Sequence, residues 1–337
     1  MNFKKAIDKM SESAKVRVSI FCTAYNQEDY ISAALDSFLI QECNFKYEIL
    51  VHDDASTDNT PAIIRAYQRK YPEIIKPVFQ EENQFSKGLT IASNFLLPLA
   101  KGDYLAWCEG DDYWLDPYKL QKQFDLMEEN KKIGFCAHAS VNVDAVSGKV
   151  ISYTKLYDDS GFVDYRDTLE RVQTFATNSF FMRRELYQDY LSSEIYPLPA
   201  HGDHKMSLFM GAVSEVYYFS DVMSAYRVAA KGSINRSVNL SKDRKKIEQN
   251  LLNNRCELLE KIDGFTNGRF HDAVIRGKKE CEYIFLLNTN QYKEIKRNWS
   301  DRFSKESLVV KLRVRLIDFC PILFYSLYRL ILKIKLN

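Results

Sequence analysis

The sequence predicts an α/β protein with a mostly parallel sheet that is covered by helices on both faces. In roughly the first 140 residues, short β-rich runs alternate with stretches whose apolar residues have helical spacing. Alternation of this kind is typical of βαβ units, in which each helix crosses over between two parallel strands. The 337 residues are 46% hydrophobic and 27% charged, which provides enough apolar material for one large domain or two ordinary ones.

The strands and helices of this first part are predicted from their residue patterns. Strands are expected where β-branched and aromatic residues gather, at Val16–Cys22, Tyr47–His52, Ile75–Phe79, Tyr104–Cys108 and Ile133–His138. Helices are expected where apolar residues recur every three or four positions, at Glu28–Leu39, Pro61–Lys70, Thr90–Leu99 and Lys119–Glu129. Pro61 suits the first turn of its helix, because the backbone N–H groups of that turn have no partner within the helix.

The regular alternation fades after about residue 140. The elements expected there are a turn at Ser147-Gly148 between two β-like runs, a strand at Ser179–Arg183, a helix at Arg184–Leu191, and a hairpin made of Val216–Phe219 and Val222–Tyr226. From about Ser241 to Arg297 the sequence is charged and helical. This second part therefore predicts a less regular end to the sheet, followed by helices.

Carboxylates follow two of the predicted strands. Asp53 and Asp54 come directly after one strand, and Glu109, Asp111 and Asp112 come after another. A buried strand rarely ends in a crowd of like charges without a cation, and hard divalent cations prefer oxygen ligands. Ligands of open α/β sheets bind beyond the carboxyl ends of the strands, where these residues lie. The alternative for the second cluster is a solvated turn.

Asp203, within Ala200-His-Gly-Asp-His-Lys205, is a third acidic candidate. Carboxylates near a nucleotide can accept hydrogen bonds from the nucleoside, hold a metal on a diphosphate, or remove a proton from an attacking hydroxyl. Three separated clusters supply one group for each task. Asp203 can also be an ordinary helix N-cap, and Asp53-Asp54 a polar strand end before a capped helix. His201 and His204 lack the further ligands that a transition-metal site needs.

Three segments, taken together, resemble the family-2 inverting glycosyltransferases of the GT-A fold, of the type that builds bacterial surface polysaccharides. The segments are Val18–Gln27, Asp53–Asp58 and Glu109–Trp114, and the resemblance covers roughly residues 16–230. It implies a Rossmann-like GT-A domain and a metal-dependent transfer with inversion. The sugar would move from a nucleoside-diphosphate donor, UDP-linked by default, to a hydroxyl of a glycan or lipid-linked glycan acceptor.

The resemblance also implies how the donor is held. Thr23, Tyr25 and Asp54 would line the nucleoside pocket, with Asp53 beside it. Arg227, in Ala225-Tyr-Arg-Val228, would approach the diphosphate.

By the same resemblance, Asp111 and Asp112 would handle the donor sugar, the diphosphate and a Mn²⁺ or Mg²⁺ ion, and Asp203 would be the catalytic base. Glu109 stands where many members have Asp. Ala229 and Ala230 occupy a region where many members have a histidine, so a histidine role there is in doubt.

Further residues and functions stay open. Trp114 can stack on an acceptor sugar or anchor the acidic loop against the core, and Asn178 and His201 are weaker site candidates. One alternative function is a catalytically inactive GT-A subunit that binds or scaffolds. Another is a sugar nucleotidyltransferase, but Thr23–Gln27 contains neither the Gly nor the Arg of such an enzyme's phosphate loop.

The expected domain division is an N-terminal extension at 1–15, a catalytic domain at 16–235, a helical extension at 236–300 and a basic amphipathic tail at 301–337. No apolar signal segment is seen near the N-terminus. Seven scattered cysteines without a C-x-x-C pair favour reduced thiols in a cytosolic protein. The net charge of +2 argues for no particular partner, and no nucleic acid is expected.

The basic tail is expected to contact a membrane surface. From Lys293 onward eleven Lys and Arg residues face four Asp and Glu residues. Between Val309 and Leu336 these basic residues alternate with apolar runs, which Asp318, Pro321 and Arg329 interrupt. An in-plane segment on anionic headgroups fits this pattern, and the alternative is packing on the protein or dimerisation. The expected location is the cytoplasm, at the inner face of the cytoplasmic membrane.

Overall fold

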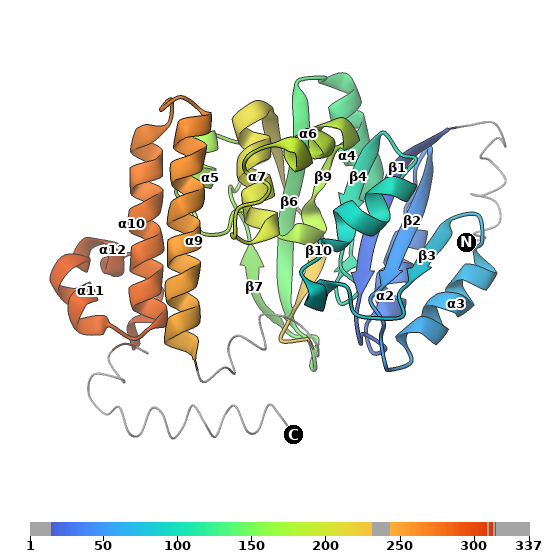
Figure 1. The fold of residues 1–337 in the computed structure, drawn as a ribbon, viewed down its shortest axis with the longest axis horizontal. Helices are drawn as coiled ribbons and strands as arrows, with labels where there is room; N and C mark the ends of the chain where they lie inside the picture. The colour runs from blue at the N-terminus through green and yellow to red at the C-terminus, as the bar shows by residue number, and fades with distance from the viewer. Residues whose placement is uncertain (1–14, 231–242, 309, 313, 315–337) are drawn as a thin grey trace.

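The computed structural model describes residues 15–230, 243–308, 310–312 and 314 of the chain. Its centre is a ten-stranded sheet in the order β3-β2-β1-β4-β9-β6-β10-β5, with β7 paired to β6 and β8 paired to β10 (Figure 1). The strands are β1 Val16–Ala24, β2 Lys46–Asp53, β3 Ile75–Phe79, β4 Tyr104–Trp107, β5 Tyr113–Trp114, β6 Ile133–Asp144, β7 Val150–Thr154, β8 Gly161–Phe162, β9 Phe181–Arg183 and β10 Glu215–Val228.

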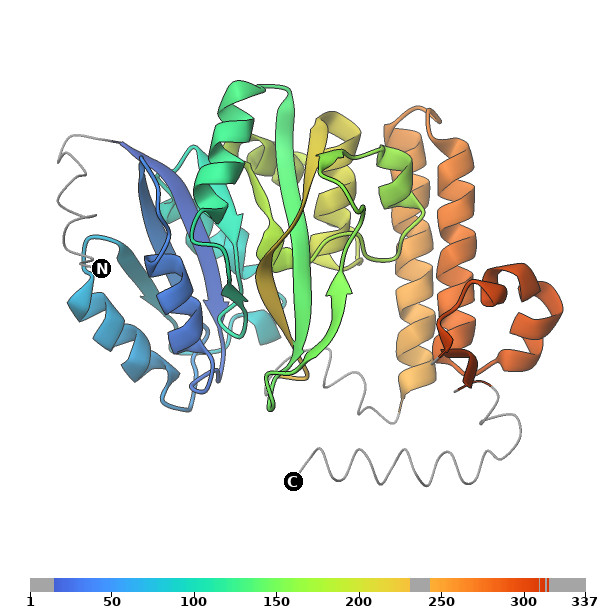
Figure 2. The ribbon, with the colours of Figure 1, turned by 180° about the vertical axis from the view of Figure 1, so that it is seen from behind.

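Helices cover both faces of the sheet (Figures 1 and 2). They are α2 Ile31–Leu39, α3 Thr60–Lys70, α4 Lys119–Glu129, α5 Tyr165–Leu169, α6 Arg184–Ser192, α7 Gly202–Val213, α9 Arg244–Phe265, α10 His271–Asn288, α11 Tyr292–Asn298 and α12 Ser300–Ser304. Short 3-10 turns lie at Phe85–Lys87 and Thr177–Ser179.

Side-chain alternation along the strands builds two cores. Ile20 of β1 is fully buried in a cluster with residues of α2 and α4, whereas its neighbour Phe21 belongs to a second cluster with residues of α6, α7 and α9. Ile49 and Leu50 of β2 divide in the same way. Since successive strand residues point to opposite faces, apolar residues at consecutive positions require cover on both sides. The predicted α/β class is confirmed.

The sheet is parallel where the acidic clusters were predicted. β1 pairs in parallel with β2 and with β4, and β2 pairs in parallel with β3. β9 runs antiparallel between β4 and β6, after which β6 and β10 are again parallel. The carboxyl ends of β1, β2 and β4 therefore meet at one edge of the sheet.

Most predicted elements are found within a few residues of their expected bounds, but the predicted hairpin is wrong. Val216–Phe219 and Val222–Tyr226 belong to one long strand, β10, which pairs in parallel with β6 from Glu215 to Val228. The register shifts between Phe219 and Val222, so the polar residues between them form an irregularity and not a turn.

The helix predicted at Thr90–Leu99 is not an α-helix. Ala92–Leu96 forms a π-helical turn and Leu97–Leu99 a 3-10 turn. Pro98 lies in the second of these turns, and a proline cannot donate the backbone hydrogen bond that an α-helix interior requires.

The C-terminal helices pack into the main core. Leu258, Leu259 and Ile262 of α9 belong to the same apolar cluster as Phe135 of β6. Gly277 of α10 approaches α5 so closely that a Cβ there would lie 2.1 Å from the carbonyl oxygen of Leu169. The boundary at residue 235 stays a prediction, since these helices share the apolar cluster of the sheet.

Among the residues that the structure describes, no helix is long and apolar enough to cross a membrane. The predicted amphipathic tail lies almost entirely outside the described residues. The six cysteines in the described part are free thiols.

Candidate active site

Two loops are joined by hydrogen bonds at the carboxyl end of β1 and β2. The Asn26 N–H donates to Ser56 Oγ at 2.9 Å, and the Thr57 N–H donates to Asn26 Oδ1 at 2.8 Å. The Gln27 N–H donates to Thr60 Oγ1 at 2.8 Å. These bonds hold the loop after β1 against the loop after β2.

The predicted nucleoside residues come together there. Thr23 pairs with His52 across the sheet, and Ala24 pairs with Asp53. Tyr25, the next residue, is 40% exposed. Both loops contain a left-handed residue, Asn26 at φ 52° and Ala55 at φ 61°.

Asp53 and Asp54 are buried but differ in their partners. The two Asp54 carboxylate oxygens accept the N–H groups of Gln84 at 2.8 Å and Phe85 at 3.0 Å, so this side chain anchors the loop after β3. Asp53 Oδ2 accepts the Ser56 N–H at 3.2 Å. Asp53 Oδ1 is buried without a hydrogen-bond partner in the described part of the chain, and burial raises the Asp53 pKa. Asp53 therefore keeps one acceptor free.

The acidic turn after β4 lies at the same edge. The Gly110 N–H donates to the carbonyl oxygen of Thr23 at 2.9 Å. A Cβ at position 110 would lie 2.4 Å from Gln27 Oε1 and 2.8 Å from Ile31 Cδ1, so a larger residue there would have to displace these two side chains. The turn thus places Glu109 and Asp111 beside the loop after β1.

The carboxyl groups of this turn are crowded. Burial, followed by the charge of Asp111, raises the Glu109 pKa to about 8. Glu109 Oε2 is buried without a hydrogen-bond partner among the described residues. Burial also raises the Asp111 pKa, while the Arg227 charge and a hydrogen bond from Gln27 act in the opposite direction. A cation beside Glu109 and Asp111 would offset the cost of keeping both ionised.

Asp112 is held inside the protein. It is 1% exposed; its Oδ1 accepts the Arg227 N–H at 2.9 Å and its Oδ2 accepts Asn178 Nδ2 at 2.9 Å. Asn178 is fully buried, and its Oδ1 accepts the Ser224 hydroxyl at 2.7 Å. Asp112 therefore ties the acidic turn to β10 and to the 3-10 turn at Thr177–Ser179.

Contacts with the acidic turn also hold the Arg227 side chain in place. Its Nη1 donates to the carbonyl oxygen of Asp111 at 2.7 Å, and its guanidinium carbon lies 4.4 Å from the centre of the Tyr113 ring. The arginine thus stands beside Asp111, and its contact with a diphosphate stays a prediction.

Trp114 anchors the turn in the core. It is 2% exposed, its ring packs edge-on against Phe38 at 4.7 Å, and its Nε1 donates to the Asn178 carbonyl oxygen at 3.0 Å. Of the two alternatives for Trp114, packing fits the structure.

Asp203 lies in the first turn of α7. The helix begins at Gly202, so Asp203 is not its N-cap residue, and its Oδ1 accepts the His204 N–H at 2.8 Å. The charge of Asp203 contributes to the raised pKa of Glu109, so Asp203 lies within electrostatic reach of the acidic turn. His201 is exposed and His204 is buried.

Sequence reasoning gave no role to two residues that shape the site. Gln27 acts to lower the Asp111 pKa, and it closes the first motif, Val18–Gln27, which is a usable signal. Ser224 supports Asn178 from the middle of β10, and nothing in its local sequence marks it.

In the described residues, no three His, Cys, Asp or Glu side chains form a group that could by itself hold a metal ion. The assignment of Asp111 and Asp112 to a metal stays a prediction. Glu109 and Asp111 nevertheless fit a hard cation, since Glu109 has an unpartnered buried oxygen and both carboxyl pKa values are raised. Mg²⁺-type ions are usually held by one or two carboxylates together with substrate phosphates.

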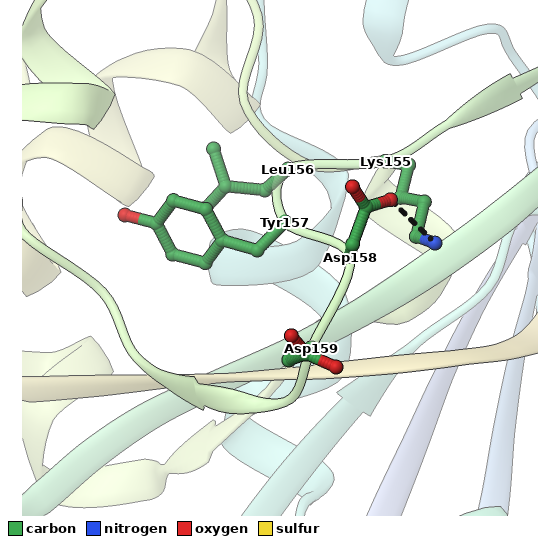
Figure 3. Close-up of a pocket in the computed structure, with 5 residues that line it drawn as sticks. All are labelled: Lys155, Leu156, Tyr157, Asp158 and Asp159. Carbon is green, nitrogen blue, oxygen red and sulfur yellow. Dashed lines mark ion pairs between the residues drawn. The ribbon is translucent and has the colours of Figure 1, made fainter.

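A separate open hollow is lined by the loop Lys155–Asp159, which follows β7 (Figure 3). Lys155 and Asp158, which both line it, form an ion pair at 3.1 Å. None of the residues predicted for the site lines this hollow.

Known proteins resemble this chain in sequence and in fold. An uncharacterised protein of Mycobacterium tuberculosis is 34% identical over 224 residues, which cover 64% of this chain and 60% of that relative's length. A UDP-Glc:alpha-D-GlcNAc-diphosphoundecaprenol beta-1,3-glucosyltransferase of Escherichia coli is 29% identical over 181 residues, covering 52% of this chain and 68% of that protein.

Among solved structures, S. aureus TarS 1–349 in complex with UDP-GlcNAc has a similar fold. Its TM-score is 0.54 at 17% identity, covering 83% of this chain and 92% of that one. This likeness supports the GT-A fold. The sequence model of the family described as Glycosyl transferase family 2 matches residues 19–191, just over half of the chain. The chain therefore belongs to glycosyl transferase family 2.

Proposed function

We propose that this protein transfers a sugar from a UDP-linked donor to a hydroxyl of a lipid-linked glycan, with inversion at the anomeric carbon. One observation carries the proposal. The acidic residues after β2 and β4 meet at one sheet edge, beside Arg227, and the charge of Asp203 acts on the same edge through Glu109. Nucleoside, diphosphate and acceptor hydroxyl would each find a suitable group there.

The donor would lie along this edge from β2 to β10. Thr23, Tyr25 and Asp53, whose Oδ1 has no hydrogen-bond partner among the described residues, would face the nucleoside end, with Asp54 as an anchor. Arg227, fixed beside Asp111, would meet the diphosphate. TarS binds UDP-GlcNAc and the Escherichia coli relative is named for UDP-Glc, which supports a UDP-linked donor.

Glu109 and Asp111 would hold a Mn²⁺ or Mg²⁺ ion, with Asp112 behind them. When bound, such an ion neutralises the negative charge that develops on a departing diphosphate. Asp112 uses both of its oxygens on protein donors, so it is the least accessible of the three carboxylates. We therefore assign the direct contact to Asp111 and Glu109, and the support to Asp112.

The chain's own groups account for the rest of the reaction. The acceptor hydroxyl attacks the anomeric carbon while the bond to the diphosphate oxygen breaks on the opposite face. Asp203 takes the hydroxyl proton, and the Arg227 guanidinium stabilises charge on the leaving group. One displacement of this kind inverts the anomeric configuration and needs no covalent enzyme intermediate.

A lipid-linked acceptor also implies where the enzyme works in the cell. The acceptor of the Escherichia coli relative is a diphosphoundecaprenol-linked sugar, and a peripheral position at the inner face of the cytoplasmic membrane would bring the enzyme to such a lipid. The basic tail, 301–337, would supply the membrane contact, and the catalytic domain would span 16–235. Liposome flotation of the full chain, compared with a chain that ends at Lys305, tests this proposal. Equal flotation of the two chains would refute membrane binding by the tail.

The alternative is a family member that binds without catalysis. A panel of nucleotide sugars with Mn²⁺ or Mg²⁺, scored for nucleotide release, separates the two. We expect turnover by the wild type, its loss in EDTA, and a loss of about 10²–10⁴-fold in Asp203→Asn with donor binding largely retained. Full activity in EDTA would refute the proposed dependence on a metal ion. If Asp203→Asn turns over as fast as wild type, Asp203 is not the catalytic base.

A further inference from the structure

Helix α9 brings an arginine to the first turn of α7. Asn254 Nδ2 donates to the carbonyl oxygen of Pro199 at 2.5 Å, and eleven positions later the Phe265 ring packs against Phe209 at 5.8 Å. α9 therefore runs beside α7 in the same direction, as the adjacent ribbons in Figure 1 also show. Arg255, which follows Asn254, is thus level with the start of α7.

Arg255 is half-buried and has no partner among the residues that the structure describes. Within the described residues, no carboxylate lies at ion-pair distance from it and no acceptor hydrogen-bonds it, although the charges of Asp203 and Glu248 reach it. Other arginines of the helical region are paired: Arg276 lies 2.8 Å from Glu170, and Arg302 is 2.6 Å from Glu280. Burial lowers the Arg255 pKa. A half-buried charge without a counter-ion in the described part of the protein is stabilised further when an anionic ligand pairs with it.

His204 offers a second unpartnered group at the same place. It is 9% exposed, and its ring makes no hydrogen bond to any described residue. Burial, helped by the charges of Arg255 and His201, lowers its pKa to about 4, so at neutral pH the ring is uncharged and donates one N–H. At the start of α7 the His204 N–H donates to Asp203 Oδ1 at 2.8 Å, whereas the Gly202 and Asp203 N–H groups have no partner within the helix, and such free groups favour anions.

We propose that Arg255, His204 and the first turn of α7 form an anion subsite that holds a phosphate of the acceptor. The inference rests on the proposed function, because Asp203 of the same turn is the base that meets the acceptor hydroxyl. Asp203 is itself negative, so the phosphate must be separated from it, and the sugar ring that carries the hydroxyl provides that separation. An acceptor whose diphosphate is attached directly to this sugar has the required geometry, and the acceptor of the Escherichia coli relative is of this kind.

Calorimetry with inorganic pyrophosphate tests the subsite without turnover. The full chain is saturated with UDP in the absence of divalent ions, so that the donor position is filled, and pyrophosphate is then titrated. We expect binding by the wild type, a loss of about tenfold or more in Arg255→Gln, and a smaller loss in Arg255→Lys. Lys261→Gln removes one exposed charge from the same helix and should bind like wild type. Absent binding by the wild type, or equal binding by Arg255→Gln, overturns the subsite.

Kinetics with two acceptors distinguish phosphate binding from support of the base. The same sugar is offered on a diphosphate-linked lipid and on a neutral octyl chain. Arg255→Gln should raise the KM of the diphosphate acceptor about tenfold and leave the neutral acceptor and the donor KM unchanged. Equal losses on both acceptors would mean that Arg255 acts through Asp203, which overturns the assignment. Absence of any transfer by the wild type would instead refute the proposed function and leave the pyrophosphate result to decide the subsite.

Discussion

Asp111 and Asp112 are neighbours in sequence, yet the structure uses them in opposite ways. Asp112 is buried with both oxygens bonded to Arg227 and Asn178, whereas Asp111 is partly exposed beside Glu109, whose Oε2 has no described partner. A satisfied buried carboxylate fixes the backbone around it, and an unsatisfied one is available to a ligand. A short acidic motif therefore contains a structural half, Asp112, and a reactive half, Glu109 with Asp111.

Asp111→Asn should cause the largest effect of this comparison. It removes a charge from the reactive half but keeps the shape of the side chain, so we expect nucleotide-sugar turnover to fall about 10²–10³-fold with little change in thermal stability. Turnover and melting temperature are measured together. Asp159→Asn, on an exposed loop, is the control and should change neither. Activity of Asp111→Asn within a few-fold of wild type would contradict the placement of Asp111 in the reactive half.

Asp112→Ala should act mainly on stability. It leaves the Arg227 N–H without an acceptor inside the protein and leaves the Asn178 amide with only the Ala225 carbonyl oxygen, so the free energy of unfolding should fall by about 3 kcal/mol. Urea denaturation measures this, with Asp159→Ala as the exposed control. If Asp112→Ala unfolds at the wild-type midpoint, the hydrogen bonds of Asp112 do not hold the turn.

Glu109→Gln should change how stability depends on pH when no metal is present. The Glu109 pKa is about 8 in the folded protein, above that of an unfolded glutamate, so its contribution is fully present at low pH and is lost as pH rises through about 8. Because the folded pKa lies about three units above pH 5 and each unit corresponds to about 1.4 kcal/mol, wild type should lose about 4 kcal/mol between pH 5 and pH 9 that Glu109→Gln does not lose. Unfolding at the two pH values measures it, and identical slopes would contradict the raised pKa.

Local sequence predicted the positions of these carboxylates but not their division. Strand ends can be read from apolar runs followed by charges, and parallel pairing then brings Asp53, Asp54 and Asp111 to one edge. The partners of Asp112 come from residues 66 and 115 positions away, through strand pairings that no local pattern records. For the same reason the local pattern predicts a hairpin where the structure has the single strand β10. Arg255 gave no signal among the many charges of its helix.

Trp114→Phe should produce the smallest effect and tests where the structural half ends. The substitution keeps an aromatic ring against Phe38 but removes the Nε1–H that donates to the Asn178 carbonyl oxygen. We expect a loss of about 1 kcal/mol in unfolding free energy and an unchanged acceptor KM, because a ring that is 2% exposed has no face left for a sugar. Denaturation and acceptor kinetics are measured on the same preparation. A raised acceptor KM without a loss of stability would move Trp114 into the reactive half, since stacking on the acceptor would then be its main role.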